Sequence, residues 1–70
     1  MNTKLAEAVG QRIVQMRKSK GLPQEKLALL AEIDRSYMSR IERGKINITL
    51  EKLYQIAETL GCDVKELLPW

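Results

Sequence analysis

The chain has 70 residues, enough for one domain over residues 1–70 and too few for two. Hydrophobic residues make up 44%, charged residues 30% and the net charge is +3, a balance typical of a folded soluble domain rather than a disordered chain. The sequence has no histidine and a single cysteine, which excludes Cys/His zinc sites, histidine-dependent catalytic triads and a disulfide within the chain.

Two helices are predicted in the first half of the chain. The first runs to about Ser19 and ends at Gly21, because glycine readily takes the left-handed conformation that closes helices. At about 100° per residue, its apolar stripe consists of Leu5, Val9, Ile13 and Met16. The second helix is short, begins at Pro23, whose missing N–H costs nothing in a first turn, and ends near Ala31. Its inward face consists of Leu27, Ala28 and Ala31.

A third helix is predicted from Arg35 to Arg43. Asp34 is a good N-cap, because its carboxylate can accept hydrogen bonds from amides two or three residues on, and Gly44 closes the helix. Met38 and Ile41 share the inward face. The outer face, which contains no acid and no aliphatic residue, consists of Arg35, Ser36, Ser39, Arg40 and Arg43.

The last third of the chain predicts two more helices. Thr49 caps a fourth helix, whose broad apolar stripe ends before Gly61. Asp63 can cap a fifth helix over residues 64–68, which stops at Pro69. The expected fold is all-α: a compact five-helix domain in which the second and third helices form a candidate helix-turn-helix over about residues 23–43. This pattern alone is also compatible with other small helical bundles.

The charge is unevenly distributed along the chain. Residues 10–21 contain four basic residues and no acid, and residues 34–45 contain four basic residues and two acids, whereas residues 46–70 are net negative. Such asymmetry is typical of a nucleic-acid-binding protein, although a run of charge also occurs on ordinary solvated surfaces.

The composition also predicts where the protein works. The single thiol, Cys62, is typical of a reducing compartment, and its place between two predicted helices favours a structural role. The N-terminus lacks a charged segment followed by an apolar run, and no apolar run is long enough to span a bilayer. We therefore expect a cytoplasmic protein with no membrane partner.

Several separated stretches of the sequence resemble one known family. They are Gly21–Ala28, Ile33–Lys45, Leu50–Leu53 and Ala57–Gly61. In order and spacing they resemble the helix-turn-helix domain of phage Cro and repressor proteins, the xenobiotic-response-element family, over roughly residues 9–68. Residues 34–37, 42–44 and 47–50 are also similar to the small controller proteins of restriction-modification systems.

The resemblance implies a lambda-repressor-like, sequence-specific transcriptional regulator that binds double-stranded DNA as a homodimer on a two-fold symmetric operator. It implies no enzymatic activity, no cofactor, no metal and no small-molecule ligand. The base-reading residues that it implies are Arg35, Ser36, Ser39 and Arg40. The contacts to the DNA backbone that it implies are Gln24, Arg43, Lys45 and Asn47. Tyr37 lies between the two faces of its helix, so it can pack at the core edge or touch DNA.

Two positions depart from the family pattern. Relatives usually have glycine in the turn between the second and third helices, where this chain has Glu32, so a positive φ there would carry a steric cost. Relatives also prefer serine or threonine where this chain has Pro23, so the usual side-chain N-cap of the second helix is missing.

Two further contacts are predicted. Arg17 and Glu42 each lie at the edge of an apolar stripe, so each needs a partner, and the resemblance independently implies that they form an ion pair.

The last residues present more apolar surface than one short helix can bury, which predicts a dimer interface formed by Leu67, Leu68 and Trp70. The alternative for Trp70 is that it folds back over the core as a lid or is disordered. The main alternative function is a module that binds a protein partner.

Overall fold

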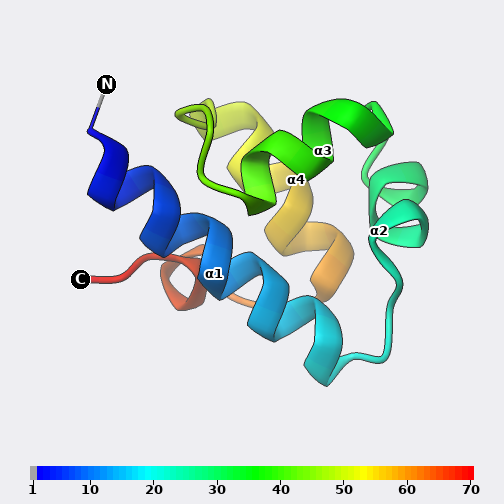
Figure 1. The fold of residues 1–70 in the computed structure, drawn as a ribbon. Helices are drawn as coiled ribbons and strands as arrows, with labels where there is room; N and C mark the ends of the chain where they lie inside the picture. The colour runs from blue at the N-terminus through cyan, green and yellow to red at the C-terminus, as the bar shows by residue number, and fades with distance from the viewer. Residues whose placement is uncertain (1) are drawn as a thin grey trace.

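The computed structural model describes residues 2–70 as four α-helices followed by one short 3-10 helix. The elements are α1 (Thr3–Ser19), α2 (Gln24–Leu30), α3 (Arg35–Glu42), α4 (Leu50–Leu60) and the 3-10 helix η1 (Val64–Leu67) (Figure 1). The prediction of an all-α fold is therefore confirmed. The prediction of a fifth α-helix is wrong, because Pro69 forces Leu68 into extended backbone, with φ −98° and ψ 136°, and leaves room for one 3-10 turn only.

The helices begin at side-chain caps, with one exception. Asp34 accepts hydrogen bonds from the backbone amides of Ser36 and Tyr37 at 3.0 and 3.2 Å. Thr49 caps α4 by accepting from the Lys52 amide at 3.2 Å. At α2, Pro23 itself is the N-cap residue and makes no side-chain hydrogen bond, so the helix starts one residue later than predicted and without a cap.

All five elements contribute to one core. Its fully buried side chains are Ile13, Leu27, Met38, Ile41, Ile56 and Leu67. The complete burial of Leu67 corrects its assignment to a dimer interface: the 3-10 turn directs this side chain between α1 and α4, on which η1 packs. Leu68 and Trp70 remain exposed, at 36% and 83%.

The helices are arranged so that α3 lies across one end of the molecule. In Figure 1, α1 runs diagonally in front, α4 lies behind it and α3 lies above, with α2 at the right. α3 packs on both α1 and α2. The contact with α1 is close: a Cβ atom at Gly10 would lie 2.6 Å from the backbone oxygen of Ile41 and 2.7 Å from that of Glu42. Only glycine lets the two backbones approach this closely.

The turn between α2 and α3 has a defined geometry. The amide of Glu32 donates to the Leu29 carbonyl at 3.2 Å, and the amide of Ile33 donates to the Ala28 carbonyl at 2.9 Å. This is the Schellman arrangement, which requires a left-handed residue at its turn position. Glu32 occupies that position with φ 58°, the conformation in which the sequence predicts a steric cost. The turn fixes the start of α3 relative to α2.

Candidate nucleic-acid interface

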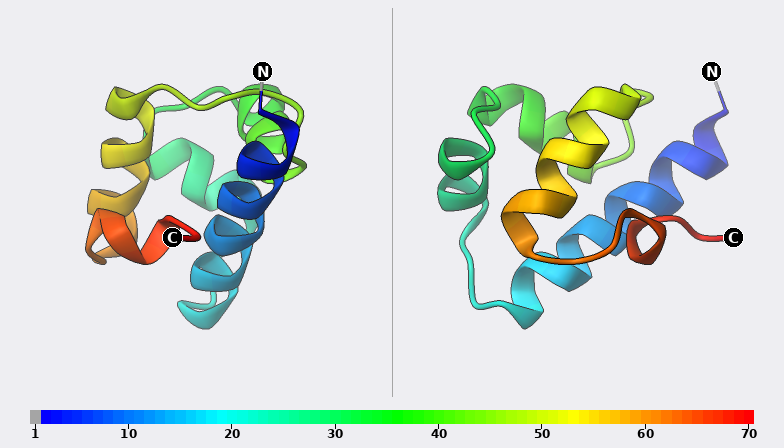
Figure 2. Two further views of the ribbon diagram at one scale, coloured as in Figure 1. Left: turned by 90° about the vertical axis from the view of Figure 1, so that its left-hand side faces the viewer. Right: turned by 180° about the vertical axis from the view of Figure 1, so that it is seen from behind.

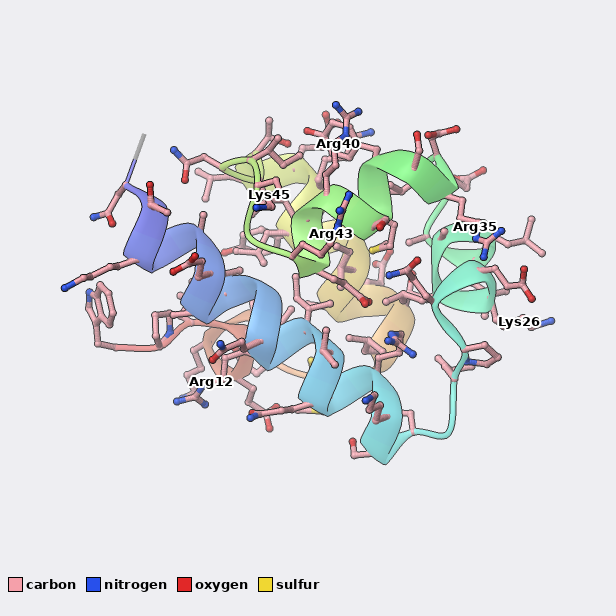
Figure 3. All side chains as sticks on the ribbon, viewed as in Figure 1. Arg12, Lys26, Arg35, Arg40, Arg43 and Lys45 are labelled. Atoms are coloured by element: carbon pink, nitrogen blue, oxygen red, sulfur yellow. The ribbon has the colours of Figure 1, made fainter. Side chains whose placement is uncertain are left out.

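The outer face of α3 is held by the core beneath it. Met38 and Ile41 on its inner face are 0% and 2% exposed. On the opposite side the predicted base-reading residues are exposed, except for Ser39, which is half-buried. Figure 3 shows Arg40 projecting away from the body, with Arg35 at the α2 end of the helix and Arg43 at its other end. A rigid helix therefore carries guanidinium groups at its start, middle and end.

The first turn of α3 is fixed by Asp34. In addition to the two backbone amides, its carboxylate oxygen Oδ2 accepts a hydrogen bond from the Ser36 hydroxyl. The hydroxyl of Ser36, followed by the amide of Tyr37, lowers the pKa of the Asp34 carboxyl below its ordinary value of 3.8. Because the Ser36 hydroxyl already donates its proton to Asp34, it offers acceptor lone pairs to a ligand.

The predicted ion pair between Arg17 and Glu42 is present and bidentate. Arg17 Nε donates to Glu42 Oε2 at 2.8 Å, and Arg17 Nη2 donates to Glu42 Oε1 at 3.1 Å. The two side chains are only 11% and 4% exposed. Arg17 Nη1 also donates to the Leu22 carbonyl at 2.8 Å. The pair therefore joins α1, α3 and the segment that leads into α2.

Gln24, expected at a DNA phosphate, makes a contact that sequence reasoning missed. Its amide nitrogen Nε2 donates to Glu42 Oε1 at 2.9 Å. The two residues are 18 positions apart and lie on different helices, so no local pattern indicates the contact. The amide group has a second proton and an oxygen that this bond does not use. The half-buried Gln24 is thus held at the start of α2 by the same carboxylate that holds Arg17.

Tyr37 lies at the edge of the core, packed against it and half-buried. Two cations approach its ring: Arg40 Cζ lies 5.7 Å and Lys52 Nζ 6.0 Å from the ring centroid. Lys52 was not among the predicted site residues. The signal that could have found it is a lysine in the first turn of α4, where the helix dipole disfavours a positive charge.

The segment after α3 carries the remaining predicted contacts. Arg43 is exposed, and its Nε donates to the Ser39 carbonyl at 3.3 Å. Lys45 and Asn47 are exposed, and the Lys45 amide is tied to the Arg40 carbonyl at 2.9 Å. In Figure 3, Arg43 and Lys45 lie together at the end of α3 that approaches α1. The α3 surface therefore continues into this segment.

Two basic residues of α1, Arg12 and Arg17, do not extend this surface. Arg17 is committed to Glu42, and Figure 3 shows Arg12 projecting from the side of α1 away from Arg40. Of the two basic stretches seen in the sequence, the second supplies the exposed cations on α3. Within residues 2–70, no cluster of three or more potential metal-binding side chains occurs. No helix in the same part of the chain has the length and apolarity needed to cross a membrane.

Comparison with known proteins decides the family. A family model described as helix-turn-helix matches residues 13–67, which span all five elements from within α1 to η1. The chain belongs to the helix-turn-helix family, of the Cro and repressor type. In this family member the motif consists of α2, the Schellman turn at Glu32 and α3.

Relatives of this helix-turn-helix chain include controller proteins. The control protein C.BamHI of Bacillus amyloliquefaciens is 43% identical over 60 residues, covering 84% of this chain and 74% of that protein. The crystal structure of the restriction-modification controller protein C.AhdI from Aeromonas hydrophila has a TM-score of 0.87 at 40% identity, covering 90% of this chain and 96% of that one. The clp gene regulator ClgR from C. glutamicum has a TM-score of 0.86 at 30% identity, covering 90% and 82%.

The family gives the function at a coarse level. This helix-turn-helix chain is a DNA-binding regulator of transcription, since its family and its relatives are transcriptional regulators and not enzymes.

Proposed function

We propose that the protein is a cytoplasmic homodimer that binds a two-fold symmetric DNA operator and regulates transcription, with α3 of each protomer in the major groove. The observation that carries the proposal is the outer face of α3, where exposed guanidinium groups stand on a helix locked by core packing and by the Asp34 cap. A helix of this width fits the major groove, whose base edges an arginine fork can recognise.

The residues of the surface divide into two roles. We assign base reading to Arg35, Ser36, Ser39 and Arg40. Arg35 Nη1 lies 4.0 Å from Glu25 Oε2, and the two side chains are 71% and 68% exposed. Because this ion pair is weak, Arg35 can readily leave Glu25 to bind a base or a phosphate. We assign contacts to the DNA backbone to Gln24, Tyr37, Arg43, Lys45 and Asn47. These contacts set the register and carry no direct sequence information.

An apolar groove on the opposite side from α2 supports the homodimer. Figure 2, left, shows this side of the molecule, with α1 and α4 flanking it and the end of the chain between them. The groove is lined mainly by Leu5, Val9, Ile46, Ile48, Leu50, Leu53 and Leu68. Leu50 and Tyr54, one turn apart on α4, are 75% and 60% exposed. We therefore propose an interface that uses Leu50, Leu68 and Trp70, without Leu67.

The names of two relatives support a narrower role. C.AhdI is a restriction-modification controller and C.BamHI is a control protein. We propose that this chain likewise controls genes of a restriction-modification system. Selecting bound fragments from the source genome tests this role: bound sites should lie beside genes for a nuclease and a methyltransferase. Bound sites that all lie elsewhere contradict it.

Salt dependence of duplex binding tests the function itself. An operator is first selected from random DNA, and binding is then measured from about 50 to about 200 mM salt. A groove binder with several phosphate contacts loses affinity steeply over this range, and Arg35→Ala or Arg40→Ala should lose more affinity for the operator than for scrambled duplex. Lys45→Ala is the matched control and should weaken both alike. A flat salt profile favours the protein-binding module instead.

A further inference from the structure

Two cations from different helices converge on one aromatic ring. Arg40 lies one turn beyond Tyr37 on α3, whereas Lys52 lies in the first turn of α4. Arg40 Cζ and Lys52 Nζ lie 5.7 and 6.0 Å from the centroid of the Tyr37 ring. The negative face of an aromatic ring attracts cations at such distances. The ring therefore brings a side chain from outside the helix-turn-helix motif to the side of α3.

In the part of the chain that the structure describes, neither cation forms an ion pair with a carboxylate. Within residues 2–70 the ion pairs are Arg17 with Glu42 and Arg35 with Glu25, and neither involves Arg40 or Lys52. Lys52 is half-buried and stands at the positive end of the α4 dipole, where a second positive charge nearby is unfavourable. An external anion at this place would relieve both repulsions.

We propose that Lys52 binds a phosphate of the DNA backbone beside Arg40, and that Tyr37 is the positioning residue that holds both cations. The inference rests on the proposed function, because the anion is the phosphodiester of a duplex docked on α3. It adds α4 to the DNA contact surface. It also gives the Tyr37 ring a role through its face rather than its hydroxyl.

The first arm of the test is Lys52→Met, which keeps most of the side-chain length and removes the charge. Affinity should fall several-fold on the selected operator and on scrambled duplex alike, and the slope of log affinity against log salt should drop by about one unit. Lys20→Met, at an exposed lysine beyond the end of α1, is the matched control and should leave the slope unchanged. An unchanged slope for Lys52→Met overturns the proposal.

The second arm separates the Tyr37 ring from its hydroxyl. Tyr37→Phe keeps the ring and removes only the hydroxyl, so its salt slope should equal that of the unaltered protein even where the lost hydroxyl lowers the affinity, whereas Tyr37→Leu should reproduce the loss of slope seen for Lys52→Met. The double variant Tyr37→Leu/Lys52→Met should lose no more slope than either single variant. If Tyr37→Phe loses as much of the salt slope as Tyr37→Leu does, the positioning role is wrong. Should Tyr37→Leu fail to fold, Tyr37→Phe and Lys52→Met still decide the question.

The two levels of the proposal fail differently. The affinity of the unaltered protein for duplex can fall steeply with salt while Lys52→Met keeps the same salt slope as Lys20→Met. In that case this inference fails and the proposed function stands. If the unaltered protein shows no salt-dependent binding to any duplex, both fail together.

Discussion

Glu42 connects three parts of the molecule through one carboxylate. It accepts from Arg17 of α1 and from Gln24 of α2 while belonging to α3 itself. Its side chain is 4% exposed, so its charge depends on these donors rather than on water. The carboxylate that pairs with Arg17 is therefore also the one that holds Gln24 at the start of α2, where we propose a contact to DNA.

Removing the charge of Glu42 should destabilise the fold. Glu42→Gln leaves Arg17 without its counter-charge, and we expect the free energy of unfolding to fall by about 3 kcal/mol, as for a well-buried pair that loses one partner. Urea denaturation measures the change. Glu25→Gln, at the exposed pair with Arg35, is the control and should change stability by less than about 0.5 kcal/mol. Equal effects of the two variants would mean that burial of the Arg17 pair contributes nothing.

Glu32 carries a conformational cost that a glycine would remove. At φ 58° a residue with a Cβ is strained, so Glu32→Gly should be more stable than Glu32→Ala by about 1 kcal/mol. Both variants lose the carboxylate, so their difference isolates the backbone. Thermal unfolding of the pair provides the measurement, and an alanine variant as stable as the glycine variant would contradict the prediction.

The pKa of the Asp34 carboxyl should lie below its ordinary value. Its pKa lies below 3.8 because the Ser36 hydroxyl and backbone amides stabilise the charged form. A lowered folded-state pKa means that this carboxylate stabilises the fold above pH 3.8 and that the contribution is lost as the pH falls through the folded-state value. Following the Asp34 side chain by NMR in Ser36→Ala should show its pKa rising toward the ordinary value. Ser19→Ala, which removes a hydroxyl elsewhere, should leave it in place.

At the scale of the elements, local chemistry predicts most of the fold. The apolar stripes predict the buried faces of α1 and α3 and most of that of α4, although Leu50, the first residue of the α4 stripe, is 75% exposed. Asp34 and Thr49 act as the N-caps that the sequence indicates. The fate of Leu67 could not be predicted, because its burial depends on the space that α1 and α4 leave between them. The bond of Gln24 to Glu42 likewise depends on how α2 and α3 cross, which no periodicity encodes.

The contact between α1 and α3 depends on one missing side chain. Gly10→Ala places a methyl group within 2.7 Å of two backbone oxygens of α3, which cannot move aside as a side chain can. Although alanine favours a helix, we expect the clash to dominate and to destabilise the domain by about 2 kcal/mol. Gln11→Ala, at the exposed next position of α1, should stay within about 0.5 kcal/mol in the same unfolding experiment. A Gly10→Ala variant of increased stability would refute the close contact.

At the scale of the whole molecule, apolar side chains are exposed at two places: Leu50 and Leu68 at the groove, and Leu29 on α2. We expect only the first to form the dimer interface. Leu50→Glu or Leu68→Glu, in the groove between α1 and α4, should leave only an 8.0 kDa species in equilibrium sedimentation at micromolar concentration. Leu29→Glu is the matched control: Leu29 is 70% exposed on α2, outside the proposed interface, and the change should leave the dimer intact. If the unaltered protein is monomeric, the proposed dimer is excluded. If the dimer is lost only in Leu29→Glu, the interface lies on α2 instead.

The exposure of Trp70 has an optical consequence. It is the only tryptophan in the chain, and its indole is 83% exposed at the edge of the proposed interface. Indole emission shifts to shorter wavelength when the ring leaves water. Excitation at a wavelength longer than those that tyrosine absorbs selects this one residue. Fluorescence of the unlabelled protein can therefore follow dimer formation as the protein concentration is raised. The wavelength of maximum emission at each concentration reports the fraction of chains that are in dimers.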